Sequence, residues 1–493
     1  MAVVTWNGSS STLYSTAANW DTGSVPGDGD DVVIPDTSSI NACNVRSNDS
    51  CNSLTVSTNG EIGSDNGSKL AILGEADGTG VTNDGYAVKI DGVITDNTTT
   101  SLDLDMRTQA TTLIDIVPTS GSIRNLVINH ASFIGTFLGN TSISGNLTIN
   151  SGELKSAGSN SLTVTGNCIV EGTLTGNASA ISLGSLYINN GGTYSATSGT
   201  TTITNLNSSS GNRSFRLHTG GTLTHNNGKF LFNRNGDQFI GSTPSDATIT
   251  FYDLELTSSG SAAKQIRDMD LLVANDLTVG ANVTFSHEQV ADVITVTGDV
   301  DVSGTLNCST TSGGANMNPT FGSLTINSGG TYTATAGTTI IKGNASSSTN
   351  LALNIDSNAT FTHNSGTILF DGTNTFGGSS YGHFYFGDKT FNDITINASG
   401  KFIQPRKSND STLDINGDLT ITAGQLSNYN NGISWDIAGD VDVSGTLGIT
   451  DSTGAYSFGG IRINSGGTYN ATSGTTTVTN RFTGTSNLWK NDG

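Results

Sequence analysis

One phrase recurs three times along the chain at an almost constant spacing. The three copies read SLYINNGGTYSATSGTTTITN at 185–205, SLTINSGGTYTATAGTTIIK at 323–342 and IRINSGGTYNATSGTTTVTN at 461–480. The first glycine of the GGTY motif is Gly191, Gly329 and Gly466 in turn, so successive copies lie about 138 residues apart. Self-similarity at a fixed period is the sequence signature of a repeat architecture, which grows along one axis.

Two further landmarks hold nearly the same period. His225 and His363 stand in the phrases LTHNNG and FTHNSG, with the same separation as the first two GGTY copies. The phrase GDVDVSGTL starts at Gly298 and again, after a nearly equal interval, at Gly439, and a diverged copy, GNCIVEGTL, starts at Gly166. Independent landmarks that share one period make a chance match very unlikely.

The texture between the landmarks favours solenoid coils over a tandem β-sandwich. Strand-sized phrases such as NLTIN, SLTVTG, DLTVG and DLTITAG follow one another, separated only by Gly, Ser and Asn turns. Three such phrases in ~20 to 23 residues would make one coil, so a super-repeat would hold about six or seven coils. We therefore predict an all-β, right-handed parallel β-solenoid with ~138-residue super-repeats and an N-terminal cap.

This repeat predicts five sections. They are an N-terminal cap with the first coils at 1–60, a first solenoid section at 61–141, super-repeat 1 at 142–275, super-repeat 2 at 276–417 and a truncated super-repeat 3 at 418–493.

Composition excludes several functional classes. The chain has 20 basic and 41 acidic residues, and its basic residues form no cluster, so nucleic acid is not an expected partner. No stretch approaches the ~20 apolar residues of a membrane helix, so membrane insertion is not expected. The N-terminal MAVVTWNGSSSTLY also lacks the basic and apolar segments of a secretion signal.

The first thirty-five residues carry a distinct pattern. It consists of TWNG with Trp6, AANW ending at Trp20, and VPGDGDDVVIP from Val25 to Pro35. This pattern resembles the start of β-helical repeat regions in large bacterial surface and autotransporter-like proteins, and of fibre-like bacteriophage proteins. The resemblance implies a β-helix on a virion or cell surface, with the Trp pattern as the entry cap. The missing signal and the missing C-terminal membrane barrel pattern favour the phage alternative.

Acidic residues two apart on a strand share one face, where a polysaccharide-degrading enzyme could hold its carboxylates. Such pairs are Asp103 and Asp105, Asp268 and Asp270, Asp299 and Asp301, and Asp440 and Asp442. Because the last two pairs are repeat copies, an exposed acidic ladder is the preferred interpretation, ahead of a hydrolase site or a cation site. Asp28 to Asp31 have the density of aspartates of a Ca²⁺ loop, but the full EF-hand spacing is missing, so they are interpreted as a turn into a strand, with Ca²⁺ binding as the alternative.

The cysteines and histidines indicate structural positions. Cys168 aligns with Val300, and Cys308 also falls on an aliphatic repeat position, so both are expected in the core. Cys43 and Cys51 leave open whether they pair. The shared repeat position of His225 and His363 predicts a common turn and argues against a shared metal site. We expect no catalytic, cofactor-binding or metal-binding residues in this chain.

Aromatic and basic residues gather at two places. YGHFYFGDKTF and KFIQPRK, within 381–407, predict a glycan or protein recognition surface formed by Tyr381, His383, Phe384, Tyr385 and Arg406. The alternative is that these rings fill a wider coil. At the other place, residues 481–493, the predicted contact residues for another chain are Phe482, Leu488 and Trp489.

Together these features predict a non-enzymatic structural protein of a phage virion, such as a fibre, spike or capsid decoration, located at the virion surface. Its expected partners are further copies of itself, other virion proteins, and a host surface glycan or protein. A secreted bacterial adhesin or sheath protein, at the cell surface, is the alternative. A polysaccharide-degrading β-helix enzyme is the least favoured hypothesis.

Overall fold

The computed structural model describes most of the chain. The described residues are 2–76, 85–95, 101–109, 111–208, 211–243, 247–287, 293–309, 318–406, 412–429, 432–448 and 453–484, with the backbone of 489–491. They form two compact units, unit 1 with Met1–Arg234 and Gln238–Pro244, and unit 2 with Asn235–Asp237 and Ser245–Gly493. Within the described residues, the one helix is the 3-10 turn η1 (Ala17–Asn19), and the rest of the regular structure is β.

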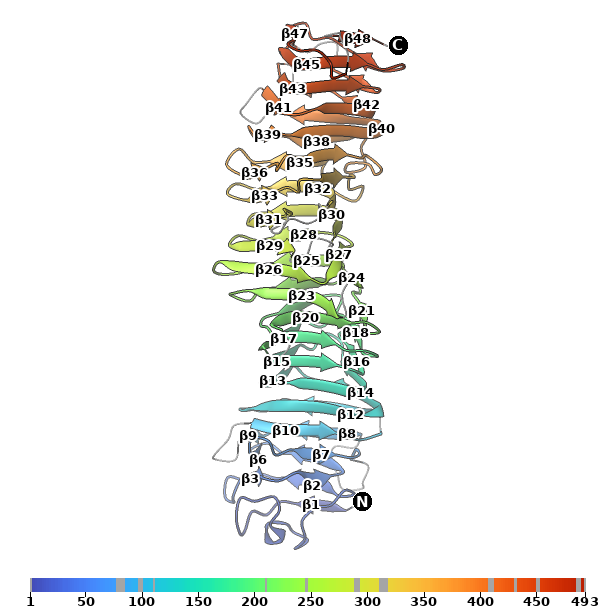
Figure 1. Cartoon of the computed structure of the whole chain (residues 1–493). Coiled ribbons are helices and arrows are strands. Elements are labelled where there is room, and N and C mark those ends of the chain that lie inside the picture. The colour runs from blue at the N-terminus through green and yellow to red at the C-terminus, as the bar shows by residue number, and fades with distance from the viewer. Residues whose placement is uncertain are drawn as a thin grey trace. The chain divides into compact units, whose positions relative to one another are not determined.

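Unit 1 is a parallel β-solenoid whose strands stack one above another (Figure 1). Strand pairing arranges them in three faces. Face 1 contains β1 (Val3–Thr5), β2 (Asp31–Ile34), β5 (Ser53–Val56), β8 (Tyr86–Ile90), β11 (Thr111–Ile116), the ends of β12 (Ser122–Phe137) and β14 (Leu147–Ser156), β16 (Thr173–Thr175), β18 (Thr193–Ser195) and β21 (Thr222–Thr224). Face 2 contains β4 (Asp49–Cys51), β7 (Leu70–Ile72), β10 (Ser101–Met106), the starts of β12 and β14, the ends of β15 (Leu162–Val170) and β17 (Ile181–Ile188), β20 (Arg213–His218) and β23 (Gln238–Thr243). Face 3 contains β3 (Cys43–Val45), β6 (Glu61–Ser64), β9 (Val93–Ile94), β13 (Thr141–Ile143), the starts of β15 and β17, β19 (Thr200–Ile203) and β22 (Lys229–Phe232).

Unit 2 repeats this three-faced, parallel arrangement. Face A contains β24 (Ala247–Phe251), β27 (Met269–Val273), the starts of β30 (Ile294–Val302) and β32 (Thr320–Ile326), β34 (Thr338–Ile341), β37 (Thr367–Phe370), the starts of β40 (Asp393–Arg406) and β42 (Leu419–Leu426), the ends of β43 (Ser434–Val443) and β45 (Tyr456–Ile463), and β48 (Trp489–Asn491). Face B contains β25 (Asp253–Leu256), β28 (Leu277–Val279), the ends of β30 and β32, β35 (Leu351–Ile355), β38 (Tyr381–Tyr385), the ends of β40 and β42, β44 (Thr446–Leu447) and β46 (Thr468–Tyr469). Face C contains β26 (Ala262–Arg267), β29 (Val283–His287), β31 (Thr305–Asn307), β33 (Thr331–Thr333), β36 (Thr360–Thr362), β39 (Thr390–Phe391), β41 (Thr412–Ile415), the starts of β43 and β45, and β47 (Thr476–Val478). The predicted all-β parallel solenoid is confirmed.

Alternation along each strand decides which side chains form the core. In β30, Ile294, Val296, Gly298, Val300 and Val302 are buried, whereas the residues that alternate with them are not. Val300 lies between Leu277 of the preceding coil and Leu324 of the next. This is the period of two that a strand imposes, repeated in register from coil to coil.

The repeated GGTY phrase forms the same turn and the same core contact three times. Its first glycine has a φ of 83°, 78° and 82° at Gly191, Gly329 and Gly466, a left-handed conformation that glycine adopts without steric cost. The tyrosine hydroxyl then contacts a threonine in the strand that follows. The pairs are Tyr194 with Thr201 at 2.7 Å, Tyr332 with Thr339 at 2.7 Å and Tyr469 with Thr476 at 2.8 Å.

The super-repeat is not a whole number of coils. Strand pairing connects Val296 to Val443 on face A in six steps, through Phe321, Ile341, Phe370, Ile396 and Ile421. The sequence copy of Val443, however, is Val302, which lies on face B beside Val279 and Ile326. Within unit 2, the second copy of the GDVDVSGTL phrase is therefore displaced by one face relative to the first copy.

Coil length is also less regular than the sequence predicts. Phe321 pairs with Ile341, and Ile341 pairs with Phe370, so the second of these coils is nearly half as long again as the first. The strands keep their register while the turns absorb the difference, because longer turns add little closure cost.

The predicted N-terminal cap is present. Trp6 and Trp20 are buried with ring centroids 5.0 Å apart, and Tyr14 packs against Trp20 at 4.9 Å. The Trp20 indole N–H donates to the Tyr14 carbonyl at 2.8 Å, and that of Trp6 to the Asn41 carbonyl at 2.7 Å. These partners satisfy the polar ends of rings whose faces close the first coil.

Candidate functional site

The predicted recognition surface lies on face B of unit 2. Tyr381, His383 and Tyr385 alternate along β38 and point outward, and β38 pairs with the end of β40 so that Tyr385 lies opposite Arg406. Phe384 is different, because its ring is fully buried and packs against Phe370, Phe391 and Phe386. Phe384 thus belongs to the core, and the other four predicted residues share one outer surface.

The guanidinium of Arg406 is the centre of this surface. Its Nη1 donates to the Tyr385 hydroxyl at 3.2 Å, and its Nη2 donates to Nε2 of His383 at 2.7 Å. Tyr429 covers one face of the guanidinium, with the charge 3.3 Å from the ring centroid. A cation this close to a tyrosine face gains from the ring quadrupole.

His383 is held neutral by its surroundings. Burial lowers the pKa of its imidazole, and the positive charge of Arg406 lowers this pKa further. A neutral ring can accept the Arg406 hydrogen bond through Nε2, which leaves the proton on Nδ1.

Two exposed aromatic rings lie on this surface. Tyr381 is 44% exposed and lies almost parallel to Phe402, with ring centroids 4.8 Å apart, so one ring face is supported and held in place. Tyr429 is 53% exposed. We call Tyr381, His383, Tyr385, Phe402, Arg406 and Tyr429 the Arg406 platform. Tyr429 was missed by sequence reasoning, although its separation from Arg406 along the chain matches one predicted coil length.

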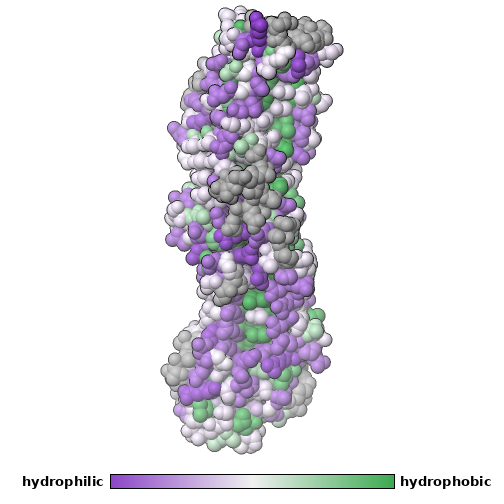
Figure 2. All heavy atoms as spheres, viewed as in Figure 1, coloured by the Kyte–Doolittle hydropathy of each residue, from purple (hydrophilic) through white to green (hydrophobic). Residues whose placement is uncertain are grey.

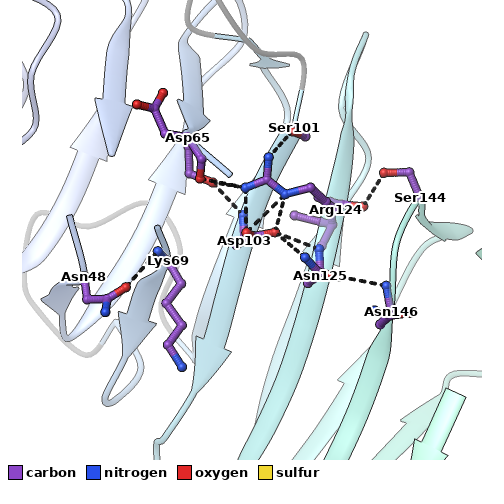
Figure 3. A network of polar contacts seen from close by, with 11 residues as sticks. Asn48, Asp65, Lys69, Ser101, Asp103, Arg124, Asn125, Ser144 and Asn146 are labelled. Carbon is purple, nitrogen blue, oxygen red and sulfur yellow. Dashed lines mark hydrogen bonds and ion pairs between the residues drawn. The ribbon is translucent and has the colours of Figure 1, made fainter. Parts of the chain in front are cut away.

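The acidic pair Asp103 and Asp105 on β10 is part of an ion-pair network on face 2 of unit 1. Asp103, which is almost fully buried, accepts from Arg124 Nε at 2.9 Å and Nη2 at 2.6 Å, and from the Asn125 side chain at 3.0 Å. Arg124 also donates to Ser101 Oγ and to the carbonyl of Asp65 (Figure 3). These partners occupy the Asp103 carboxylate, so it resembles a structural anchor more than a catalytic acid.

Asp105 is held in a similar way by two cations. Lys69 and Arg107 each contact its Oδ2 at 2.8 Å. A groove of about 380 Å³ lies beside this network and includes Lys69, Asp103, Asn125, Asn146 and Thr148 among its lining residues. Lys69, the cationic residue in that lining, is already paired with the Asp105 carboxylate.

The repeated acidic pairs lie on different faces of unit 2. Asp299 and Asp301 precede and follow Val300 on face B, whereas Asp440 and Asp442 flank Val441 on face A. Asp301 accepts from Asn327, and Asp442 pairs with Arg462. The remaining predicted pair, Asp268 and Asp270, flanks the start of β27, with Asp268 at a φ of 56°. Two copies on different faces cannot build one extended acidic surface.

Side-chain oxygens at the start of successive coils accept the backbone N–H of the next coil. In unit 1 the run starts at Asp103, whose Oδ1 accepts from Asn125 N at 3.0 Å, and continues with asparagines, since Asn125 Oδ1 accepts from Asn146 N at 2.9 Å and Asn146 Oδ1 from Asn167 N at 2.8 Å. In unit 2 aspartates accept as well, since Asp253 Oδ1 accepts from Asp276 N at 3.3 Å and Asp276 Oδ1 from Asp299 N at 2.8 Å. The two units therefore use the same bond with and without charge.

Asp276→Asn should raise the free energy of unfolding by up to about 1 kcal/mol at pH 7, because it removes charge between like charges and keeps the acceptor. Burial raises the pKa of Asp276, and the charges of Asp299 and Asp253 raise it further, against the Asp299 N–H bond that lowers it. Since the folded state then holds a proton at higher pH than the unfolded chain, wild-type stability rises as pH falls through this pKa. The gain from Asn should therefore shrink on acidification.

Urea denaturation at several pH values measures this difference. The matched variant Asp276→Ala deletes the acceptor and should instead destabilise the protein by about 1 kcal/mol. Loss of stability in Asp276→Asn at neutral pH would show that the charge itself is favourable.

The remaining sequence predictions have clear positions. All four cysteines are buried thiols outside any disulfide, so Cys43 and Cys51 do not pair, and burial raises the pKa of Cys168 and Cys308 to about 12. Asp31 starts β2 and accepts from Asn52 and Ser53, as predicted for a turn into a strand. The histidine turns agree, since the ring Nδ1 accepts the backbone N–H two residues on at 3.1 Å in His225 and 3.0 Å in His363.

The predicted assembly residues are only partly described. Phe482 is buried within its own chain, with the Arg462 charge 4.6 Å from its ring centroid. Leu488 lies outside the described residues, as does the side chain of Trp489, whose backbone pairs with Ile461 of β45. Their contact with another chain stays a prediction.

The visible surface is mainly hydrophilic, with hydrophobic residues in small separate groups (Figure 2). Among the described residues, no three His, Cys, Asp or Glu side chains are arranged to hold a metal ion. Within the same residues, no helix has the length and apolar character needed to cross a membrane. No protein-family model, curated protein or solved structure matches the chain.

Proposed function

We propose that this chain is a non-catalytic structural protein of a phage particle, a fibre, spike or capsid decoration, whose solenoid carries a recognition surface. The single observation that carries this proposal is the Arg406 platform, where exposed aromatic rings and a cation share one outer face. Enrichment of tyrosine and arginine at one exposed place is typical of binding surfaces.

The ion-paired carboxylates of the chain support binding over catalysis. The Asp103 and Asp105 carboxylates are engaged by Arg124, Lys69 and Arg107, and Asp442 is engaged by Arg462. A glycosidase needs one carboxyl to donate a proton and a second to act as base or nucleophile, both beside the substrate. Carboxylates fixed by cations in these positions serve the fold.

The partners in this proposal are other copies of the chain or other particle proteins, with residues 481 to 493 at the contact. A host surface glycan would be the external ligand. A secreted bacterial adhesin or sheath protein would use the same platform at a cell surface, and it remains the alternative.

Incubation with host surface polysaccharide should leave the polysaccharide chain length unchanged, because the platform binds and does not cleave. An assay of newly released reducing ends and size-exclusion chromatography of the polysaccharide measure this outcome. The protein is used at concentrations at which a glycosidase would act, and the incubation is long. Release of oligosaccharides that persists in an Arg406→Met variant would place an enzymatic site elsewhere on the solenoid and contradict the proposal.

A further inference from the structure

Arg406 is a cation that no carboxylate neutralises among the residues that the structure describes. Its two hydrogen-bond partners are the Tyr385 hydroxyl and the His383 imidazole, neither of which is a carboxylate, and its Nε is buried without a hydrogen-bond partner. By contrast, Arg124 and Arg462 each pair with an aspartate. In a chain with 41 acidic and 20 basic residues, an uncompensated guanidinium beside an exposed aromatic ring indicates a place where an anion binds from outside. Within the described residues Arg216 also has no carboxylate partner, but the Tyr187 ring on which it stacks is buried.

The shape of the platform limits the kind of anion. Tyr381 and Tyr385 are four residues apart on one strand, which is about 13 Å at ~3.3 Å per residue. One end of this strip presents the Tyr381 ring, which stacks on Phe402 of the neighbouring strand β40, and the other end presents the guanidinium. The strip is therefore flat and extended, with an apolar ring face at one end and a positive charge at the other.

A peptide could add to a sheet only at a free strand edge, and this site has none. β38 pairs with β35 on one side and with β40 on the other. Recognition must therefore use side chains on the face of the sheet, where flat rings stack on the C–H faces of sugar rings and a planar guanidinium takes a carboxylate.

We propose that the Arg406 platform binds an acidic polysaccharide, with a uronic acid carboxylate on Arg406 and a neighbouring pyranose ring on Tyr381. This inference deepens the proposed function and rests on it, because it names the class of surface ligand. Arginine has five N–H donors, and the bonds to Tyr385 and His383 use two of them. Because Nε is buried, the donors left for a carboxylate from outside are the second N–H groups of Nη1 and Nη2.

Isothermal titration calorimetry of the full chain with polygalacturonate, alginate and hyaluronan tests this inference. At least one of these acidic polysaccharides should bind, and its carboxyl-reduced counterpart should bind at least tenfold more weakly. Arg406→Met should weaken binding at least tenfold because it keeps the side-chain stem and removes the charge. Tyr381→Ala removes an exposed ring and should weaken binding by a similar factor.

Arg216→Met is the matched control. Arg216 is also stacked on a tyrosine, with its charge 4.4 Å from the Tyr187 ring centroid, but it belongs to unit 1, whereas the platform residues belong to unit 2. This variant should bind as the wild type does, which excludes an effect of net charge alone. Circular dichroism of each variant shows whether it is folded. If Arg406→Met does not fold, Tyr381→Ala still tests the inference.

Three results would overturn the inference. They are no binding to any of the three polysaccharides, equal binding by wild type and both platform variants, and tighter Arg406-dependent binding of polyglutamate or inorganic phosphate than of the saccharides. Immunogold labelling of particles reports location independently of the ligand. Labelled particles without saccharide binding would therefore remove this inference and leave the proposed function standing.

Discussion

Arg124→Ala should lower the free energy of unfolding by about 3 to 5 kcal/mol, because it leaves the Asp103 carboxylate buried without its counter-charge. Asp103 accepts three hydrogen bonds from the side chains of Arg124 and Asn125 at 2.6 to 3.0 Å, besides a further contact from Arg124 Nε. Arg124 also holds the carbonyl of Asp65 at 2.8 Å, so the loss extends to the turn after β6. Urea denaturation followed by circular dichroism measures the change.

Arg46→Ala is the matched control for this prediction. Arg46 pairs with Asp65 at 3.5 Å, but the two side chains are 47% and 40% exposed. An exposed pair contributes little, so this variant should lose no more than about 0.5 kcal/mol. Similar losses in both variants would mean that the Asp103 pair is as solvated as the surface pair.

Val300→Asp should cost about 3 to 5 kcal/mol, because it places an unpaired charge between two coils. Val300 has no exposed surface and lies between Leu277 and Leu324. Thr295→Asp on the same strand, at an outward position, serves as the control and should cost less than about 1 kcal/mol. A loss below about 0.5 kcal/mol for Val300→Asp, measured by the same denaturation, would mean that Val300 faces water.

The core was predictable because it depends on local alternation. Each strand repeats a period of two, so Val300 and Cys168 could be placed inward from short phrases alone. The turns were predictable for a related reason, since Gly191 and its copies occupy a backbone conformation that only glycine adopts freely.

The faces were not predictable, because they depend on the length of every turn. A short coil and a much longer one follow one another around Ile341, and a repeat counted along the sequence therefore does not count coils. This is why Asp299 and its copy Asp440 share a sequence but not a face.

The candidate site was likewise predictable where it depends on alternation along one strand, and not where it depends on pairing between coils. Tyr381, His383 and Tyr385 share a face because they alternate on one strand, and the same alternation puts Phe384 in the core. The contact of Arg406 with Tyr429 joins two coils, so it depends on register that no local pattern contains.

Immunogold electron microscopy tests the central claim most directly. Antibodies raised against the purified chain would be applied to phage particles and to cells from the strain that encodes it. The account predicts that gold decorates the particles at one component, a fibre, a spike or the capsid surface, and leaves the envelope of uninfected cells unlabelled. Labelling confined to the cell surface, with particles unlabelled, would contradict it and identify the chain as a bacterial surface protein.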